Sequence, residues 1–289
     1  MNTTLIETSS RIPGIDRRAV KRVYRGVRKL AILVVALLWL SPVVWIALTA
    51  FKPKVDVFSL QMLFRPTFAN FIAAIHAPYL LWDRLASSSI VAFLTLAIAI
   101  PISATAAYAF SRFKFPGGAL WSVGLLATQF LPPVIIIIPL FVLFRDLHLL
   151  DSYAGLVIAN LSFVVPYAVW IMKGYFDTLP LDIEEAAQVD GASKLRAFWD
   201  VVLPLARPGI ATATIFSFVI SWNEFFYALI LTRDATVTLP VALMNARNEY
   251  GSEWEVIAML GLFITAPMLI AARYIQRYFT KGLISGAVR

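Results

Sequence analysis

Cysteine is absent from the 289-residue chain, which excludes disulfide bonds, thiolate nucleophiles and cysteine-ligated zinc or iron–sulfur clusters. Histidine is nearly absent, because His76 and His148 are the only two and their spacing does not resemble that of metal ligands. We therefore expect no structural or catalytic metal site. Charged residues are also scarce, at 15% against about 25% in an average soluble domain. The composition excludes a soluble globule.

Long apolar runs take the place of charge. Hydrophobic residues make up 60% of the chain, and the mean hydropathy is +0.78. A helix needs about 20 apolar residues to cross a bilayer core, and none of the runs alternates as a membrane β-strand does. The sequence therefore predicts an all-α integral membrane protein with six transmembrane helices, at 30–51, 85–110, 119–144, 152–172, 208–232 and 256–272.

Lysine and arginine are divided unequally between the connections of these runs. The set of connections that includes both chain ends carries 18 of the 25 basic residues, and the other set carries seven. The positive side of a membrane protein is cytoplasmic, so we expect both termini in the cytoplasm. Residues 1–29 then form a cytoplasmic N-terminal segment, and 30–289 form the six-helix domain. The net charge of +8 follows from this asymmetry, and we expect no nucleic-acid partner.

The first apolar run could also be a cleaved signal peptide. Signal peptides have a core of about 7–15 apolar residues, whereas this run extends over 30–51. We therefore expect the first helix to be retained.

The cytoplasmic segment between the fourth and fifth runs, 173–207, has the pattern of two short helices. Pro180 precedes a cluster of acids typical of a helix start, and Gly191 interrupts this first helix. Ser193 can cap a second helix, which Pro204 is expected to stop. On the second helix, apolar residues recur at helical spacing, at Leu195, Phe198, Trp199 and Val202.

This helix–glycine–helix element could lie flat on lipid or insert into a partner protein. Its acids would face an anionic leaflet if it lay on the membrane, which argues for a protein partner. These acids are Asp182, Glu184, Glu185 and Asp190. Small residues that permit close backbone approach are Ala186, Ala187, Gly191 and Ala192.

The same segment carries a known signature. Glu185-Ala186-Ala187, three residues, Gly191, nine residues and Val201-x-Leu203-Pro204 match the pattern EAA-x3-G-x9-I-x-L-P except for valine in place of isoleucine. The chain thereby resembles the permeases of binding-protein-dependent ABC importers. Two further stretches resemble the smaller permease of the maltose-importer type, namely AYAFSRFKFPG at 107–117 and SWNEFFY at 221–227.

The resemblance implies a type I ABC importer permease fold and a role in sugar import. It implies that cytoplasmic coupling helices at about 180–203 seat in a cleft of the ATPase. The residues matched to this coupling role are Glu184, Glu185, Ala186, Ala187, Asp190, Gly191, Ala192, Leu203 and Pro204.

Catalysis is expected elsewhere. The chain has no G-x-x-x-x-G-K-[ST] motif, and neither a Ser/His/Asp arrangement nor paired carboxylates stand out, so we expect no catalytic residue and no cofactor on it. The resemblance implies that ATP and Mg are bound by two copies of a partner ABC ATPase. It also implies a second permease subunit in a heterodimer, an extracytoplasmic solute-binding protein, and a location in the lipid of the bacterial cytoplasmic (inner) membrane.

Glu224 is the only acid well inside an apolar run, about 17 residues or roughly 25 Å from Arg207 if the helix is continuous. It could bind or gate substrate, accept a hydrogen bond from a neighbouring helix, or carry a proton. Sugars need polar acceptors beside aromatic faces. The candidates for a substrate pathway or gate are Trp222, Asn223, Glu224, Tyr227, Asn160 and Gln129.

Two other functions compete with the importer subunit. A secondary transporter driven by protons or ions would act alone, and the inverted repeats that support this class are not visible in the sequence. A membrane scaffold or sensor would not need proline in most spans or a buried acid. The substrate itself stays open among disaccharides, monosaccharides, polyols and modified sugars.

Overall fold

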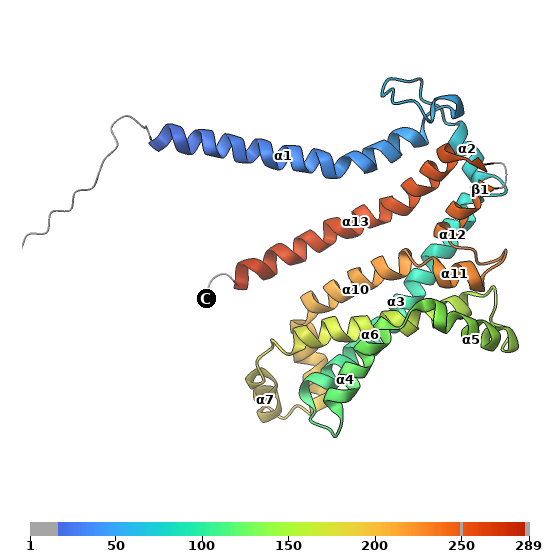
Figure 1. Ribbon diagram of the computed structural model, residues 1–289. Coiled ribbons are helices and arrows are strands. Elements are labelled where there is room, and N and C mark those ends of the chain that lie inside the picture. The colour runs from blue at the N-terminus through green and yellow to red at the C-terminus, as the bar shows by residue number, and fades with distance from the viewer. Residues whose placement is uncertain (1–16, 249–250, 287–289) are drawn as a thin grey trace, which may run out of the picture. The chain divides into compact units, whose positions relative to one another are not determined.

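The computed structural model describes residues 17–248 and 251–286 and is mostly helical (Figure 1). From the N-terminus the elements are α1 Arg17–Ala50, the 3-10 turn η1 Lys54–Asp56, α2 Ala69–Ile75, α3 Leu81–Arg112, α4 Gly118–Ala127, the 3-10 turn η2 Thr128–Phe130, α5 Pro133–Asp146 and α6 Tyr153–Phe176. They continue with α7 Asp182–Val189, α8 Lys194–Ala197, the π-helical turn η3 Phe198–Val202, α9 Leu203–Leu205, α10 Arg207–Trp222, α11 Phe226–Leu231, α12 Leu239–Asn245, β1 Arg247–Asn248, β2 Gly251–Ser252 and α13 Trp254–Gly286.

The chain divides into two units, Met1–Leu48 and Thr49–Arg289. The described part of the first unit is helix α1, which runs on to Ala50 and contains Pro42. The N-terminal segment predicted at 1–29 lies outside the described residues as far as residue 16, and from Arg17 it forms the start of α1.

Four described helices are long and apolar enough to cross a membrane. The number rises to six if two sharply bent helix pairs each count as one span, namely Leu120–Phe130 with Pro133–Asp146, and Lys194–Leu205 with Arg207–Trp222. The four are contained in α1, α3, α6 and α13 and overlap the first, second, fourth and sixth predicted spans. The predicted third and fifth spans are not continuous helices.

The third predicted span breaks at Pro132 and Pro133, where the helix axis turns by 92°. A residue that precedes proline is driven out of the helical region by a clash with the proline ring. Leu131 and Pro132 each precede a proline, and both have extended backbone, with ψ of 121° and 128°. The consecutive prolines therefore separate α4 and η2 from α5.

The fifth predicted span breaks after Trp222, and the chain resumes as α11 at Phe226. Glu224 lies in this break, two residues past the end of α10. In a bilayer every freed backbone group must find a partner. The Glu224 carboxylate provides this partner, because it accepts hydrogen bonds from the backbone N–H groups of Tyr227 and Ala228 at 2.7 and 3.0 Å.

The core of the second unit lies where α3 packs along α6 and α10 packs against both. Small side chains on the buried face of α3 allow the backbones to approach closely, namely Ser88, Ala92, Ala99, Ser103, Ala104 and Ala107. Hydrogen bonds cross these contacts, as where the Ser221 hydroxyl donates to Asn160 at 2.9 Å and Trp222 Nε1 donates to the Ile264 carbonyl of α13 at 3.0 Å.

At the other end of the bundle from α7, Asp151 organises the connection between α11 and α12. Its carboxylate accepts the backbone N–H groups of the four residues 233–236, at 3.0 to 3.2 Å. Burial alone raises the pKa of Asp151, but these four bonds outweigh it and hold the pKa well below its ordinary range. The turn between α5 and α6 is thereby tied to a loop about 80 residues later in the chain.

Candidate functional site

Helix α7 has clear start and stop signals. Acids occupy its first turn, where they favour the positive end of the helix dipole. It ends in a Schellman motif, in which Gly191 N–H donates to the Gln188 carbonyl and Ala192 N–H to the Ala187 carbonyl, both at 3.0 Å. Gly191 has a φ of +91°, a conformation that other residues rarely adopt. A Cβ there would meet nothing within 4 Å in this chain, so the glycine serves the turn rather than internal packing.

The second part of the element starts as predicted and ends at Leu205, one residue after the expected stop at Pro204, where the helix axis bends by 73° before α10. The Ser193 hydroxyl caps α8 by accepting the Arg196 N–H at 3.3 Å. The helix then widens into the π turn η3 and continues through α9 to Leu205. Pro204 lies in the first turn of α9, where its missing N–H does not interrupt the helical hydrogen bonds.

The predicted apolar stripe of the second helix is divided between two surroundings. Phe198 and Val202 are buried in the core with Met172 and Phe176, while Leu195 and Trp199 are 69% and 53% exposed. Val189, at the end of α7, is 87% exposed. An exposed apolar group of this kind on a short polar element is typical of a surface that a partner covers.

Most of the residues matched to the coupling role lie on this surface. Those exposed are Glu185, Ala186, Asp190 and Gly191, and those partly exposed are Ala187, Ala192, Leu203 and Pro204. Glu184 differs, because it is only 6% exposed and lies on the side of α7 that faces the bundle.

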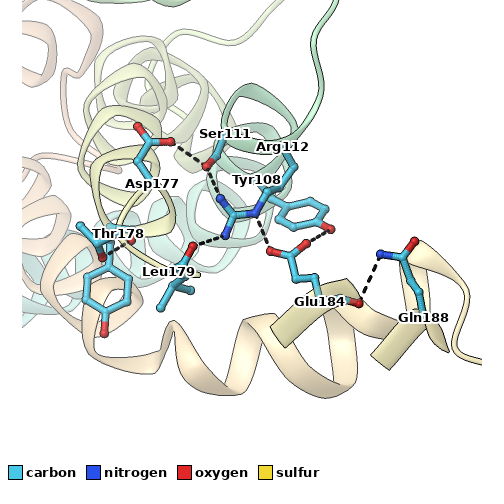
Figure 2. Close-up of polar contacts among 9 residues, drawn as sticks. Tyr108, Ser111, Arg112, Asp177, Thr178, Leu179, Glu184 and Gln188 are labelled. Atoms are coloured by element: carbon cyan, nitrogen blue, oxygen red, sulfur yellow. Dashed lines mark hydrogen bonds and ion pairs between the residues drawn. The ribbon is translucent and has the colours of Figure 1, made fainter. Parts of the chain in front are cut away.

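The carboxylate of Glu184 is held by the end of α3 (Figure 2). It accepts a hydrogen bond from the Tyr108 hydroxyl at 2.9 Å and forms a short ion pair with Arg112 Nε. The Glu184 and Arg112 side chains of this pair are 8% and 7% exposed. Removing a charge from water is costly unless it is paired and hydrogen-bonded, and both conditions are met.

Arg112 also contacts the connection between α6 and α7. Its Nη2 donates to the Leu179 carbonyl and its Nη1 to the Ser111 hydroxyl, each at 3.0 Å. The Ser111 hydroxyl in turn donates to the Asp177 carboxylate at 2.7 Å, and Lys173 donates to the other carboxylate oxygen at the same distance. Burial alone raises the pKa of Asp177, but these hydrogen bonds outweigh it and hold the pKa below its ordinary value.

Aromatic rings surround the same point. The Tyr108 ring lies 4.5 Å from Phe198 of η3, and 6.0 Å from both Phe176 and Phe113, between ring centroids. The end of α3, the end of α6, the start of α7 and the π turn therefore meet around one tyrosine. We name Tyr108, Ser111, Arg112, Asp177 and Glu184 the anchor cluster. Sequence reasoning missed its role, although the stretch 107–117 that supplies three of its members was recognisable as a motif.

The candidate pathway residues of the fifth span are mostly engaged in holding the bundle together. Trp222 is 3% exposed and bonded to α13, and Glu224 is bonded to the start of α11. Tyr227 is 4% exposed, and its ring stacks on Phe163 at 5.6 Å. Asn223 is exposed, with its amide donating to the Val219 carbonyl at 2.8 Å.

The two candidates outside that span also differ from each other. Asn160 is 1% exposed and bridges α6 to α10, because its amide donates to Leu156 and its oxygen accepts from Ser221. Gln129 is exposed in η2, and its amide donates to the Phe163 carbonyl at 3.2 Å. The structure therefore does not gather the six candidates into one site, and only Gln129 and Asn223 are exposed on the chain.

Comparison with known proteins places the chain in a family. Residues 99–285, which include the anchor cluster and the whole α7–α9 element, match the family described as "Binding-protein-dependent transport system inner membrane component". The chain belongs to this family and is therefore an ABC importer permease of the multi-pass membrane class. The structure agrees, since its helical architecture superimposes on that of solved importer permeases.

Three similar proteins illustrate the match. The trehalose transport system permease protein SugB of Mycobacterium tuberculosis is 35% identical, over 86% of this chain and 92% of its own length. The diacetylchitobiose uptake system permease protein DasC of Streptomyces coelicolor is 30% identical, over 86% of this chain and 91% of its own. A chain in the crystal structure of a bacterial ABC transporter that imports the acidic polysaccharide alginate has a TM-score of 0.74 and 25% identity, and covers 92% of this chain and 99% of its own.

Proposed function

We propose that this chain is the transmembrane subunit of an ATP-driven importer for a sugar or sugar-like solute. In this proposal it forms half of the substrate pathway and couples to a separate ATPase through the α7–α9 element. The observation that carries the proposal is an exposed surface of acidic, small and apolar residues, which lies outside the apolar spans and is fastened to the bundle by buried charge. The chain itself does no catalysis, and ATP and Mg belong to the partner.

The composition of this surface is suited to a basic, partly apolar cleft. Glu185 and Asp190 present negative charge, while Val189 and Leu195 present apolar area beside them. The exposed backbone at Gly191 is free of surrounding atoms, so a partner can approach it closely. Charge complementarity of this kind gives orientation and specificity, and desolvation of the apolar residues gives affinity.

The membrane topology follows from joining the broken spans. If α4, η2 and α5 form the third span and α10 with α11 forms the fifth, the chain has six spans with both termini on one side. The excess of lysine and arginine assigns that side to the cytoplasm of a bacterial inner membrane. The α7–α9 element then lies in the cytoplasm, and the Asp151 end of the bundle faces outward, where a solute-binding protein would dock.

A carbohydrate substrate is supported by the names of two relatives, which refer to trehalose transport and diacetylchitobiose uptake, and by the structural match to an alginate importer. We further propose a heterodimer with a second permease and two copies of the ATPase. A secondary transporter that acts alone has no observation in its favour, since the carboxylate of Glu224 is occupied by backbone N–H groups.

The test is purification of the tagged chain from its native membrane in mild detergent, followed by uptake in proteoliposomes. The preparation should contain a related permease and two ATPase copies. Uptake of radiolabelled trehalose, maltose or diacetylchitobiose should require two additions. ATP must be present on the side of the membrane that carries the ATPase, and a solute-binding protein must be added. A chain that purifies alone and moves sugar without ATP would overturn the proposal.

A pair of matched variants tests the docking surface. Val189→Glu places a charge in the exposed apolar part of the surface and should remove the ATPase from the purified complex. Val55 is equally exposed, at 89% against 87%, but lies in η1 at the other end of the bundle. Val55→Glu should leave the ATPase bound. Retention of the ATPase by Val189→Glu would contradict the assignment of this surface.

A further inference from the structure

The stretch 107–117 has no task in the importer function described so far, although its sequence is distinctive. It comprises the end of α3 and the turn to α4. Both side chains that bond the Glu184 carboxylate come from it. A third contact reaches α8, because the Lys194 ammonium lies over the Phe113 ring at 5.6 Å from its centroid. One short stretch therefore holds both helices of the docking element.

The chemistry of the Arg112 side chain explains why the contact between this stretch and α7 has a defined geometry. Its three nitrogens donate in three directions, to Glu184 of α7, to the Leu179 carbonyl before α7, and to Ser111. A guanidinium offers several donors in one rigid plane, whereas a lysine ammonium is a point charge on a flexible stem. The Arg112 guanidinium thus fixes the position and the angle at which α7 contacts the end of α3 (Figure 2).

Stability alone does not require such a pair. Replacing a buried ion pair by apolar side chains of similar size is often neutral or stabilising, because the charges no longer lose their hydration. The aromatic contacts of Tyr108 with Phe198 and Phe176 would remain in that case. What the apolar replacement cannot reproduce is the direction of the contact, since hydrophobic packing is non-directional.

We propose that Arg112 is a positioning residue that, with Tyr108, locks α7 onto the end of α3. A displacement of α7 by the ATPase is then passed to α3, and through its packing to α6 and α10, without loss in a flexible joint. This inference rests on the proposed function, because it specifies how the docking surface transmits motion to the bundle.

The absence of cysteine allows a direct test. Cysteines introduced at Asp83, in the first turn of α3, and at Gln188, four residues after Glu184 on α7, would carry one spin-label pair on this chain, in a complex whose other subunits have had any cysteines replaced. The 29 residues from Asp83 to Arg112 span about 44 Å at the helical rise. A distance of this size can be measured by double electron–electron resonance. The distance distribution would be recorded for the purified complex in the nucleotide-free state and after trapping with ATP and vanadate.

In the otherwise unmutated complex we expect a narrow distribution with the same most probable distance in both states. The double variant Arg112→Met/Glu184→Met should assemble and keep its melting temperature, yet give a broad distribution that shifts on trapping. If the ion pair contributed only to stability, the double variant would show the same narrow distance distribution and the same melting temperature as the unmutated complex. That result would overturn the proposal. Arg145→Met, which removes an exposed ion pair remote from α7, is the control and should change neither measurement.

Arg112→Lys decides the matter if the double variant does not assemble. It retains the positive charge opposite Glu184 but not the contact to the Leu179 carbonyl. A broadened distribution supports the positioning role, and an unchanged one overturns it. Failure of the unmutated chain to purify with an ATPase would instead refute the proposed function, so the two failures are distinguishable.

Discussion

Two glutamates in this chain, the buried Glu184 and the partly buried Glu224, are satisfied in different ways. Glu184 accepts hydrogen bonds from side chains of α3, about 70 residues earlier in the sequence. Glu224 accepts hydrogen bonds from backbone N–H groups three and four residues ahead of it. The first acid connects two elements, and the second completes the start of one helix. Burial of an acid therefore does not by itself indicate a substrate or coupling site, because the function depends on where its partners come from.

The largest effect is expected from removing the arginine that pairs with Glu184 while Glu184 itself is kept. Arg112→Met leaves the Glu184 carboxylate buried and without its cation, which should cost about 3–5 kcal/mol. The melting temperature of the purified complex should fall sharply. Addition of Glu184→Met should restore most of the loss. A single variant as stable as the unmutated protein would show that Glu184 is not paired as described.

A third acid, Asp151, sharpens the comparison because it binds backbone groups of a distant loop. Asp151→Asn replaces a charged acceptor of four N–H groups by a neutral one and should cost about 2–3 kcal/mol. Hydrogen exchange of the amides of 233–236 should accelerate. An unchanged exchange rate at these four amides would contradict the role of the carboxylate.

The pH dependence of this acid has a definite sign. Because the folded-state pKa of Asp151 lies below its unfolded value, its stabilisation is fully present above the ordinary pKa of an aspartate. The stabilisation is lost as the pH falls through the lowered folded-state value, well into the acid range. Melting temperatures of the unmutated protein and Asp151→Asn should therefore converge at strongly acid pH and differ by a constant amount near neutrality.

A smaller effect is expected at Glu224. Glu224→Gln keeps an oxygen acceptor but loses the charge at the start of α11, and should cost about 1 kcal/mol. Only the amides of Tyr227 and Ala228 should exchange faster, while the spin-label distance between α3 and α7 stays unchanged. Loss of sugar uptake with normal stability would instead indicate that Glu224 meets substrate.

A comparably small effect on the chain itself is expected at Gly191. Gly191→Ala must adopt a positive φ and should cost about 1 kcal/mol, whereas Gly191→Asn tolerates that region better. Asparagine nevertheless adds a side chain to the surface proposed to meet the ATPase. A normal melting temperature with weakened ATPase retention in Gly191→Asn would separate the turn from the docking role, and normal retention would argue against close approach at this residue.

Local signals in the sequence predicted the helix starts and stops well. The acids of α7, the Schellman turn at Gly191 and the cap at Ser193 each depend on residues within one turn. The signals failed where two prolines act together, at Pro132–Pro133, and where α10 ends at Trp222 before α11 begins at Phe226. Hydropathy measures length and polarity but does not register such breaks.

The sequence by itself determined that the chain is a helical membrane protein of the importer-permease family with a helix–glycine–helix element between its fourth and fifth apolar runs. Composition, run length and motif spacing are local properties, and they suffice for this. Only the tertiary structure decided that Glu184 points inward while Glu185 points outward, and that Asn160 and Trp222 bind neighbouring helices. The physical reason is that a buried polar group must find partners, and those partners come from segments far apart in the chain.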